Sequence, residues 1–326
     1  MSWQAWFAGL VVVLAIAGCG GSGGGGGGVT PIAPPSGALA EHIVAPAATD
    51  AGINNWLDDH YAYRDTRVAA RGRLLVHLPG SYGTPVNSQT YMKEMAAAGN
   101  HVIGLRYPNT WEVTDLCATD PDLTCYERVR LEIIDGTDRS ALVTVNAANS
   151  IVNRLIKLLQ YLASTWPDEG WEQYLNNGQP VWSRLLISGH SQGAGHAAVI
   201  GKYYALDRVL MFAAPGDGNS YGVAPWQDRN HVSPTAGYFG FNHDRDHLAA
   251  KLAAWTLIGL VDYGAAVDVD SVAAPYSNSH MLRSDALPAT GSYNDAHGAV
   301  ITDEKTPLLP DGTTLYAPVW RYMCCT

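Results

Sequence analysis

The residue best placed to do chemistry is the serine of the sequence GHSQG, residues 189–193, which has a glycine two residues before it and another two residues after it. The apolar run 184–188 predicts a buried strand before this pattern, and the small residues at 194–200 predict a helix after it. A tight turn between the two would lift the hydroxyl of Ser191 above the sheet edge, and glycines would avoid collisions there. The N-terminus of the following helix would favour negative charge developing nearby. This arrangement predicts that Ser191 is a nucleophile.

The same G-x-S-x-G spacing occurs twice more, so the spacing alone does not identify a site. Residues 20–24 lie in a glycine tract with no strand or helix pattern near them. Residues 218–222 follow an apolar run, but the sequence VAP at 223–225 predicts no helix after them. Of the three serines, Ser191 therefore has the flanking strand and helix that a nucleophile on a strained turn requires.

The predicted strand, turn and helix around Ser191 resemble the nucleophile elbow of the α/β-hydrolase superfamily. The sequence GHSQG is similar to the corresponding motif of bacterial lipases and cutinase-like esterases. The resemblance implies an α/β-hydrolase fold, which is a mostly parallel central sheet with helices on both faces. It also implies that a catalytic acid and then a histidine follow the serine in the chain.

A serine hydroxyl becomes reactive when a base takes its proton and a third group holds the tautomer of that base. The order implied by the resemblance favours His297, beyond the last predicted strand, as the base, with His280 as its competitor. The favoured acid is Asp246, just ahead of a predicted helix. Asp244 in the same loop and Asp217 after the preceding strand are the alternatives.

The oxyanion hole of such an enzyme needs two backbone N–H donors. The resemblance assigns one donor to Gln192, the residue after the nucleophile. The second should come from the loop that follows residues 74–77, which resembles the oxyanion loop of lipases and esterases. Pro79 has no N–H, so Gly80 and Ser81 remain as candidates.

Apolar runs that alternate with helical patterns predict a parallel sheet with crossover helices. The clearest helix is 145–165, whose apolar residues recur at a spacing of about 3.6. Residues 57–70 predict one or two antiparallel edge strands, and the aperiodic segment 108–140 predicts a cap-like insertion over the site. The remaining predicted strands are 73–78, 101–107, 184–188, 208–214, 237–241 and 280–284, and the remaining helices are 89–98 and 248–260.

The N-terminal residues 1–18 predict an export signal, because their apolar stretch is too short for a membrane span and ends in small residues. The sequence IAGC at 16–19 resembles a bacterial lipobox, which implies cleavage before Cys19 and lipid attachment to its sulfur. Residues 19–38 predict a flexible Gly/Pro-rich tether, and 39–326 a single domain. We expect a lipoprotein of the bacterial cell envelope, or a secreted protein if Cys19 is not lipidated.

Four further cysteines in an exported protein predict disulfides. Cys117 and Cys125 would close a small loop, which is the first expectation, whereas Cys324 and Cys325 could instead each reach one of these two. The sequence holds no C-x-x-C pair with matching histidines, so we expect no metal site. The net charge of −10 argues against binding to nucleic acid.

Together with the resemblance, these residues imply a serine hydrolase that cleaves carboxylic esters through an acyl-enzyme on Ser191 without a cofactor. A serine peptidase with the same triad and a non-catalytic binding protein on a hydrolase fold are the alternatives. The substrate stays open among lipid, polyester, plant-polymer and xenobiotic esters, small or polymeric. We expect contact with a membrane only through the lipid anchor, and the oligomeric state stays open.

Overall fold

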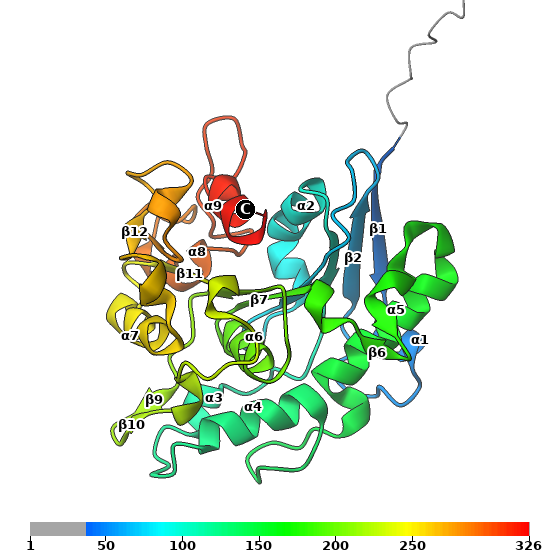
Figure 1. The fold of residues 1–326 in the computed structure, drawn as a ribbon, viewed down its shortest axis with the longest axis horizontal. Helices are drawn as coiled ribbons and strands as arrows, with labels where there is room; N and C mark the ends of the chain where they lie inside the picture. The colour runs from blue at the N-terminus through cyan, green and yellow to red at the C-terminus, as the bar shows by residue number, and fades with distance from the viewer. Residues whose placement is uncertain (1–36, 326) are drawn as a thin grey trace, which may run out of the picture. The chain divides into compact units, whose positions relative to one another are not determined.

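A mostly parallel sheet of nine strands forms the centre of the fold in the computed structural model, which describes residues 37–325. Its strands are β1 (Leu39–Val44), β2 (His60–Asp65), β3 (Leu74–Leu78), β4 (His101–Gly104), β7 (Leu185–His190), β8 (Arg208–Phe212), β11 (Tyr238–His243), β12 (Val267–Asp268) and β13 (Met281–Ser284). They lie in the order β1-β2-β4-β3-β7-β8-β11-β13-β12. Figure 1 shows β1 and β2 on one side of the molecule and β11 and β12 on the other. The pairs β1–β2 and β2–β4 are antiparallel, and the pairs from β4 to β12 are parallel. The predicted parallel sheet with an antiparallel edge is confirmed.

The central strands are buried along their length. Every residue of β3 and β4 is buried, and so are the first five residues of β7. Continuous burial is typical of parallel strands that helices cover on both faces. Leu78 pairs with Gly189, and His190 pairs with Phe212, so the carboxyl ends of β3, β7 and β8 meet at one edge. In open α/β sheets that edge is where ligands bind.

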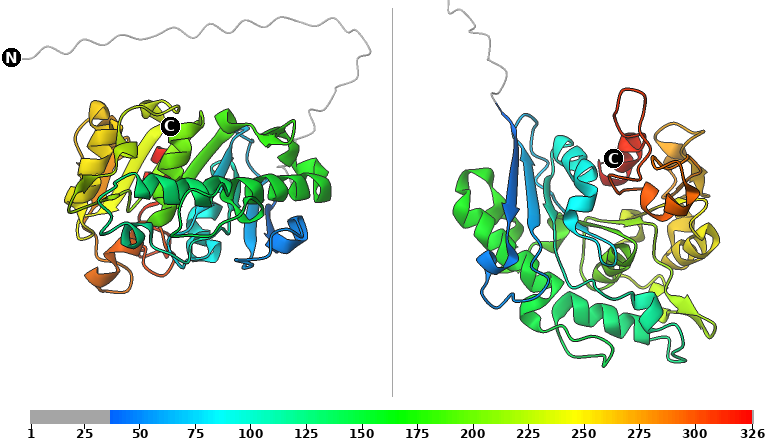
Figure 2. Two further views of the ribbon diagram at one scale, coloured as in Figure 1. Left: turned by 90° about the horizontal axis from the view of Figure 1, so that it is seen from below. Right: turned by 180° about the vertical axis from the view of Figure 1, so that it is seen from behind.

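Helices cover both faces of the sheet. The longer ones are α2 (Gln89–Ala97), α4 (Cys125–Asp135), α5 (Ile151–Thr165), α6 (Gln192–Tyr203), α7 (Leu248–Ile258) and α9 (Ala317–Cys325), and the one-turn helices are α1 (Pro46–Thr49), α3 (Val113–Leu116) and α8 (Ala296–Ala299). One buried core joins Val76 and Ile187 to α4, α5, α6 and α7. A second core joins Leu75 and Leu186 to α2 and α9, which lie side by side (Figure 2). Neighbouring residues of one strand thus enter different cores, as the alternation of side chains across a sheet requires.

The clearest predicted helix begins later than expected. Helix α5 starts at Ile151 rather than at residue 145, because Ser150 has extended backbone and its Oγ accepts the N–H of Asn153 at 3.3 Å. Such a cap satisfies one of the free N–H groups in the first turn. The buried face is the one that the spacing predicts, with Ile151, Leu155, Leu158, Leu159 and Leu162.

The segment 108–140 is not aperiodic, since it contains the short helix α3 and the eleven-residue helix α4. Helix α4 packs against α5 and α6 and buries Val129 and Ile133. Its periodicity is hidden because Arg130 and Glu132 are also buried. Both charges have partners: Arg130 pairs with a carboxylate, and Glu132 accepts backbone N–H groups of the following loop.

The four cysteines of the described part form two disulfides. Cys117 is bonded to Cys125, which confirms the first expectation. Cys324 is bonded to Cys325, so the alternative pairing with the loop cysteines is wrong. The predicted signal at 1–18, the lipidation site Cys19 and nearly all of the tether 19–38 lie outside the described residues. Within 37–325, no helix has the length and apolar character that crossing a membrane requires.

Candidate active site

Ser191 occupies the sharp turn between β7 and α6. Strand β7 ends at His190, α6 begins at Gln192, and Ser191 between them has φ 53° and ψ −120°. A positive φ in a residue other than glycine is uncommon and costs free energy, so the surrounding structure must hold it. The N–H of Ser191 donates to the carbonyl oxygen of Phe212 at 2.8 Å, which ties the turn to β8. The serine thus lies at the carboxyl edge of the sheet.

Both glycines of the GHSQG pattern are required by close backbone contacts. A Cβ on Gly189 would lie 2.2 Å from the carbonyl carbon of Gly193. A Cβ on Gly193 would lie 2.1 Å from the carbonyl oxygen of Leu78. Any side chain at either position would therefore displace α6 from β7 or β3.

The competing G-x-S-x-G pattern within the described residues has a different setting. Ser220 is exposed between the two-residue strands β9 (Gly218–Asn219) and β10 (Gly222–Val223), which form a hairpin. The short strands β5 (Leu175–Asn176) and β6 (Gln179–Pro180) form another. No regular α-helix follows Ser220 directly, as the sequence predicts, and Ser22 lies outside the described residues.

His297 and Asp246 are joined by a hydrogen bond. The Nδ1 of His297, in α8, donates to Oδ2 of Asp246 at 2.9 Å. Asp246 follows β11 and is only 6% exposed, and its own N–H donates to the carbonyl oxygen of His243 at 3.0 Å. Donation from Nδ1 leaves Nε2 of a neutral imidazole as the acceptor. This is the tautomer that a general base needs.

The alternative candidates for the catalytic acid and base interact with residues other than His297 and Asp246. Asp244 forms an ion pair with Arg283. Asp217 forms a buried ion pair with Arg130. The ring of His280 stacks on Phe239 at 4.0 Å between centroids, and its Nδ1 hydrogen-bonds the carbonyl oxygen of Tyr238. Of the three aspartates considered, Asp246 is the one hydrogen-bonded to His297.

Burial and nearby positive charge have opposite effects on the pKa of the Asp246 carboxyl group. Burial alone would raise its pKa, because it disfavours the charged form. The hydrogen bond and positive charge of His297, together with Lys251 and His247, outweigh burial and lower the pKa below its ordinary value. Asp246 therefore stays ionised and can stabilise an imidazolium at His297.

His190, within the GHSQG pattern, positions the histidine loop. Its Nε2 donates to the backbone carbonyl oxygen of His297 at 2.9 Å, and the two ring centroids are 4.9 Å apart. Burial lowers the pKa of His190 to about 3, with a smaller contribution from the nearby charge of His297, so its ring is neutral. Sequence reasoning missed this role, because nothing in the pattern itself distinguishes this histidine from a spacer.

Three backbone N–H groups near Ser191 are free to donate. The N–H groups of Gln192, Gly80 and Ser81 have no hydrogen-bond acceptor within residues 37–325. Gly80 approaches the serine closely, since a Cβ added to it would lie 3.2 Å from the Cβ of Ser191. The geometry brings together the donors that the sequence predicts for an oxyanion hole, without choosing between Gly80 and Ser81.

Hydrogen bonds brace the loop that carries these donors. The hydroxyl of Tyr107 donates to the carbonyl oxygen of Pro79 at 2.7 Å, and the amide of Asn109 donates to that of Gly80 at 2.6 Å. The side chain of Gln192 accepts the N–H of Val113 at 3.0 Å and the hydroxyl of Ser81 at 3.3 Å. The residue after the serine thus connects α3 to the Gly80–Ser81 loop.

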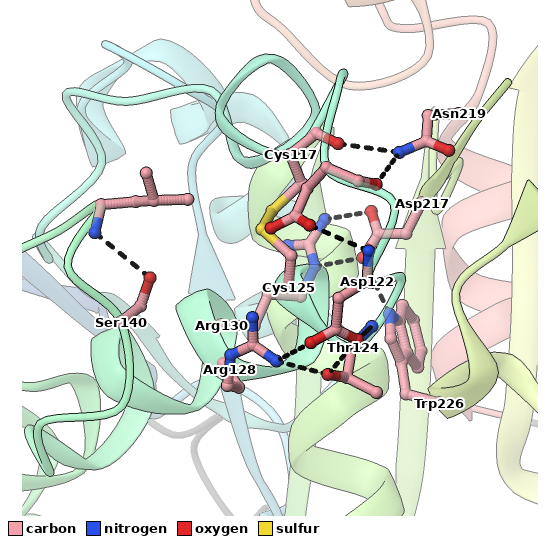
Figure 3. Close-up of a disulfide and its surroundings, with 12 residues drawn as sticks. Cys117, Asp122, Thr124, Cys125, Arg128, Arg130, Ser140, Asp217, Asn219 and Trp226 are labelled. Carbon is pink, nitrogen blue, oxygen red and sulfur yellow. Dashed lines mark hydrogen bonds and ion pairs between the residues drawn. A yellow bond between two sulfur atoms is a disulfide. The ribbon is translucent and has the colours of Figure 1, made fainter. Parts of the chain in front are cut away.

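A buried ion pair supports the start of α6. The guanidinium of Arg130 contacts the carboxylate of Asp217 through two hydrogen bonds of 2.6 Å, and the indole of Trp226 donates to the same carboxylate (Figure 3). Arg130 Nη1 also donates to the carbonyl oxygen of Gln192 at 3.1 Å. A Cβ on Gly195 would lie 2.3 Å from the guanidinium, so glycine makes room for it. A charge this deeply buried beside the turn is unusual unless it is paired.

Ser191, Asp246 and His297 line one cavity of about 1000 Å³, together with Gly80, Ser81 and Gln192. In the described part of the chain, no hydrogen bond joins Ser191 Oγ to His297, so the shared cavity is what relates them. The described residues contain no cluster of three or more histidine, cysteine, aspartate or glutamate side chains suited to a metal ion. The arrangement can supply a nucleophile, a base with a fixed tautomer, and backbone donors.

No protein-family model and no curated protein sequence matches the chain.

Proposed function

We propose that this protein is a serine hydrolase of the α/β-hydrolase superfamily that cleaves carboxylic esters. The observation that carries the proposal is the hydrogen bond between His297 and Asp246 in the cavity that Ser191 lines. The chain order of serine, aspartate and histidine supports the same class, as does the strained turn between β7 and α6. The free N–H groups after β3 and after the serine correspond to the two halves of an oxyanion hole.

In this proposal the reaction has two halves. His297 Nε2 takes the proton of Ser191 as Oγ attacks the ester carbonyl, and the resulting oxyanion accepts hydrogen bonds from Gln192 and from Gly80 or Ser81. The tetrahedral intermediate expels the alcohol, which receives the proton from His297. Water then attacks the acyl-enzyme with His297 again as base, and the acid is released. Asp246 stabilises the imidazolium and keeps the tautomer fixed throughout.

Turnover of p-nitrophenyl acetate by the full chain tests the proposal. We expect Ser191→Ala and His297→Gln to lower kcat about 10⁶-fold, and Asp246→Asn to lower it about 10⁴-fold. Ser220→Ala is the matched control, because it removes a serine with the same spacing from an exposed hairpin. Unchanged turnover in folded Ser191→Ala protein would refute the role of this serine. A folded chain that turns over no ester would favour the peptidase or the binding protein.

The proposal also includes export and lipid attachment at Cys19. Metabolic labelling of bacterial cells with an alkyne fatty acid should tag the full chain and leave a Cys19→Ser variant untagged. Equal tagging of both chains would contradict attachment at this cysteine, and an untagged but released protein would favour ordinary secretion.

A further inference from the structure

We propose that the substrate is a short-acyl ester of a hydroxyl-rich alcohol, such as an O-acetylated sugar, rather than a lipid. This inference rests on the proposed function, because it concerns what the same cavity holds. It is drawn from the chemistry of the cavity wall, from the small residues beside the nucleophile, and from charged groups in the wall that have no partner.

Apolar side chains are scarce in the cavity wall. No leucine, isoleucine, methionine, phenylalanine, tyrosine or tryptophan among the described residues lines it. Four of the tryptophans are packed in the core, since Trp171, Trp226, Trp255 and Trp320 are each at most 1% exposed. Small-molecule pockets are usually lined mainly by apolar and aromatic side chains, so this wall departs from the common pattern.

A polar wall gives a long acyl chain little to bind. Burying one methylene group against apolar surface contributes about 0.8 kcal/mol, and a fatty acyl chain depends on many such contributions. Contact with charged or hydroxyl groups supplies no such gain and removes water from those groups at a cost. The cavity therefore disfavours substrates whose affinity comes from a long hydrocarbon chain.

The apolar side chains that line the cavity within the described residues are no larger than valine. They belong to Pro79, Val86, Val113, Ala213 and Ala214, and the last three adjoin the turn that carries Ser191. Ala213 and Ala214 directly follow Phe212, whose carbonyl oxygen binds the N–H of Ser191. Val113 contacts the side chain of Gln192 through its own N–H. This lining fits an acyl group of a few carbons, from acetyl to butyryl.

Polar residues form a wall that its own hydrogen bonds hold in place. The carboxylate of Asp303 accepts the N–H groups of Gln89 at 3.1 Å and Thr90 at 3.0 Å, which fixes it at the start of α2. The N–H of Asp303 donates to the carbonyl oxygen of Asn87 at 2.9 Å. The segment that carries Thr302 and Glu304 is thereby joined to the segment after the Gly80–Ser81 loop. A wall that is already ordered loses little conformational entropy when it binds a ligand.

Several charged groups of the wall have capacity left for a ligand. Within residues 37–325, the exposed carboxylates of Glu112 and Glu304 have no hydrogen-bond or ion-pair partner. The ammonium of Lys251 in the same wall acts on Asp246 through its charge but forms no hydrogen bond there. Carboxylates accept hydrogen bonds and ammonium groups donate them, so hydroxyl groups can satisfy both kinds. The mixture of signs favours a neutral polyhydroxyl alcohol over an anionic or a cationic one.

Two ester comparisons on the full chain test the inference. For acyl length, kcat/KM for p-nitrophenyl butyrate should exceed that for p-nitrophenyl octanoate at least about tenfold. For the alcohol, acetate release from acetylated xylose should exceed release from cyclohexyl acetate by a similar factor. Equal or faster turnover of the octanoate, or of cyclohexyl acetate, would overturn the inference.

A variant locates the preference in the polar wall. Glu304→Gln should raise KM for acetylated xylose several-fold, because a carboxylate binds hydroxyl groups more strongly than a neutral amide does. Glu172→Gln is the control, since Glu172 is exposed and does not line the cavity. Serine-dependent turnover with a long-chain optimum would overturn the substrate class and leave the hydrolase proposal intact. No turnover of any ester by the folded chain would overturn both.

Discussion

Replacing Asp217 by asparagine should strongly destabilise the protein, because it leaves a positive charge buried without its partner. The side chains of Arg130 and Asp217 are 3% and 0% exposed. Asparagine keeps the shape of aspartate, but its NH₂ group faces the N–H groups of the guanidinium and its charge is lost. Breaking a buried ion pair at one partner costs about 3–5 kcal/mol of unfolding free energy.

The matched control for this prediction is an exposed ion pair of the same two residue types. The side chains of Arg229 and Asp262 are 52% and 51% exposed. Solvent screens such a pair, so Asp262→Asn should cost only about 0–1 kcal/mol. Urea unfolding followed by tryptophan fluorescence measures both variants, provided that the slope of free energy against urea concentration stays the same.

A second variant separates the unpaired charge from lost packing. The double substitution Arg130→Met with Asp217→Leu removes both charges and should recover much of the stability that Asp217→Asn loses. The reasoning is refuted if Asp217→Asn costs no more than Asp262→Asn. It is also refuted if the double variant is less stable than Asp217→Asn, because the buried charge would then not be the cause.

Three further predictions concern the turn at Ser191, the disulfide Cys117–Cys125, and the histidines His77 and His190. Gly193→Ala should inactivate the protein and lower its melting temperature sharply, because its Cβ would lie 2.1 Å from the carbonyl oxygen of Leu78. Replacing both cysteines of Cys117–Cys125, which are 8 residues apart, with serine should lower the unfolding free energy in urea by about 2–3 kcal/mol. Burial lowers the pKa of both His77 and His190 to about 3, while in the unfolded chain they take up protons near pH 6.5. The unfolded state then binds more protons, so acidification from pH 6.5 towards 3 should cost up to about 1.4 kcal/mol per pH unit for each histidine.

Each of these predictions has a result that contradicts it. Gly312→Ala is the control for the turn: no atom lies within 4 Å of its added Cβ, and its φ of +83° should cost only about 1–2 kcal/mol. Equal losses in the two glycine variants would mean that the contact with Leu78 is not limiting. Unchanged stability of the serine double variant would mean that the disulfide Cys117–Cys125 does not stabilise the fold. A flat unfolding free energy between pH 4 and 6 would show that the two histidines take up protons in the fold.

The elements whose signals lie in neighbouring residues, such as the buried strands and the turn at Ser191, were predictable from the sequence. The strands β3, β7 and β8 each contain an apolar run of at least three residues, because parallel strands are buried on both faces. The turn at Ser191 was predictable because its glycines stand between such a run and a helix. Strand β1 was missed because it is an edge strand whose two polar residues, Glu41 and His42, interrupt its apolar run.

Side-chain partners that depend on how distant parts of the chain pack together could not be predicted from the sequence. Asp244 and Asp246 occupy one loop, and only the course of the backbone turns Asp246 towards His297 and Asp244 towards Arg283. Helix α4 was missed because Arg130 occupies its buried face, where a periodicity search expects an apolar residue. The partner that makes this burial tolerable, Asp217, lies 87 residues away in the chain.

Covalent capture by an organophosphate tests whether Ser191 is the nucleophile. The full chain is treated with diethyl p-nitrophenyl phosphate, and the adduct is measured by mass spectrometry of the intact protein and of its peptides. We expect a single diethyl phosphoryl group on Ser191, absent from Ser191→Ala, retained in Ser220→Ala, and formed far more slowly in Asp246→Asn. A folded protein that gains no adduct, or gains it on another residue, would contradict the account.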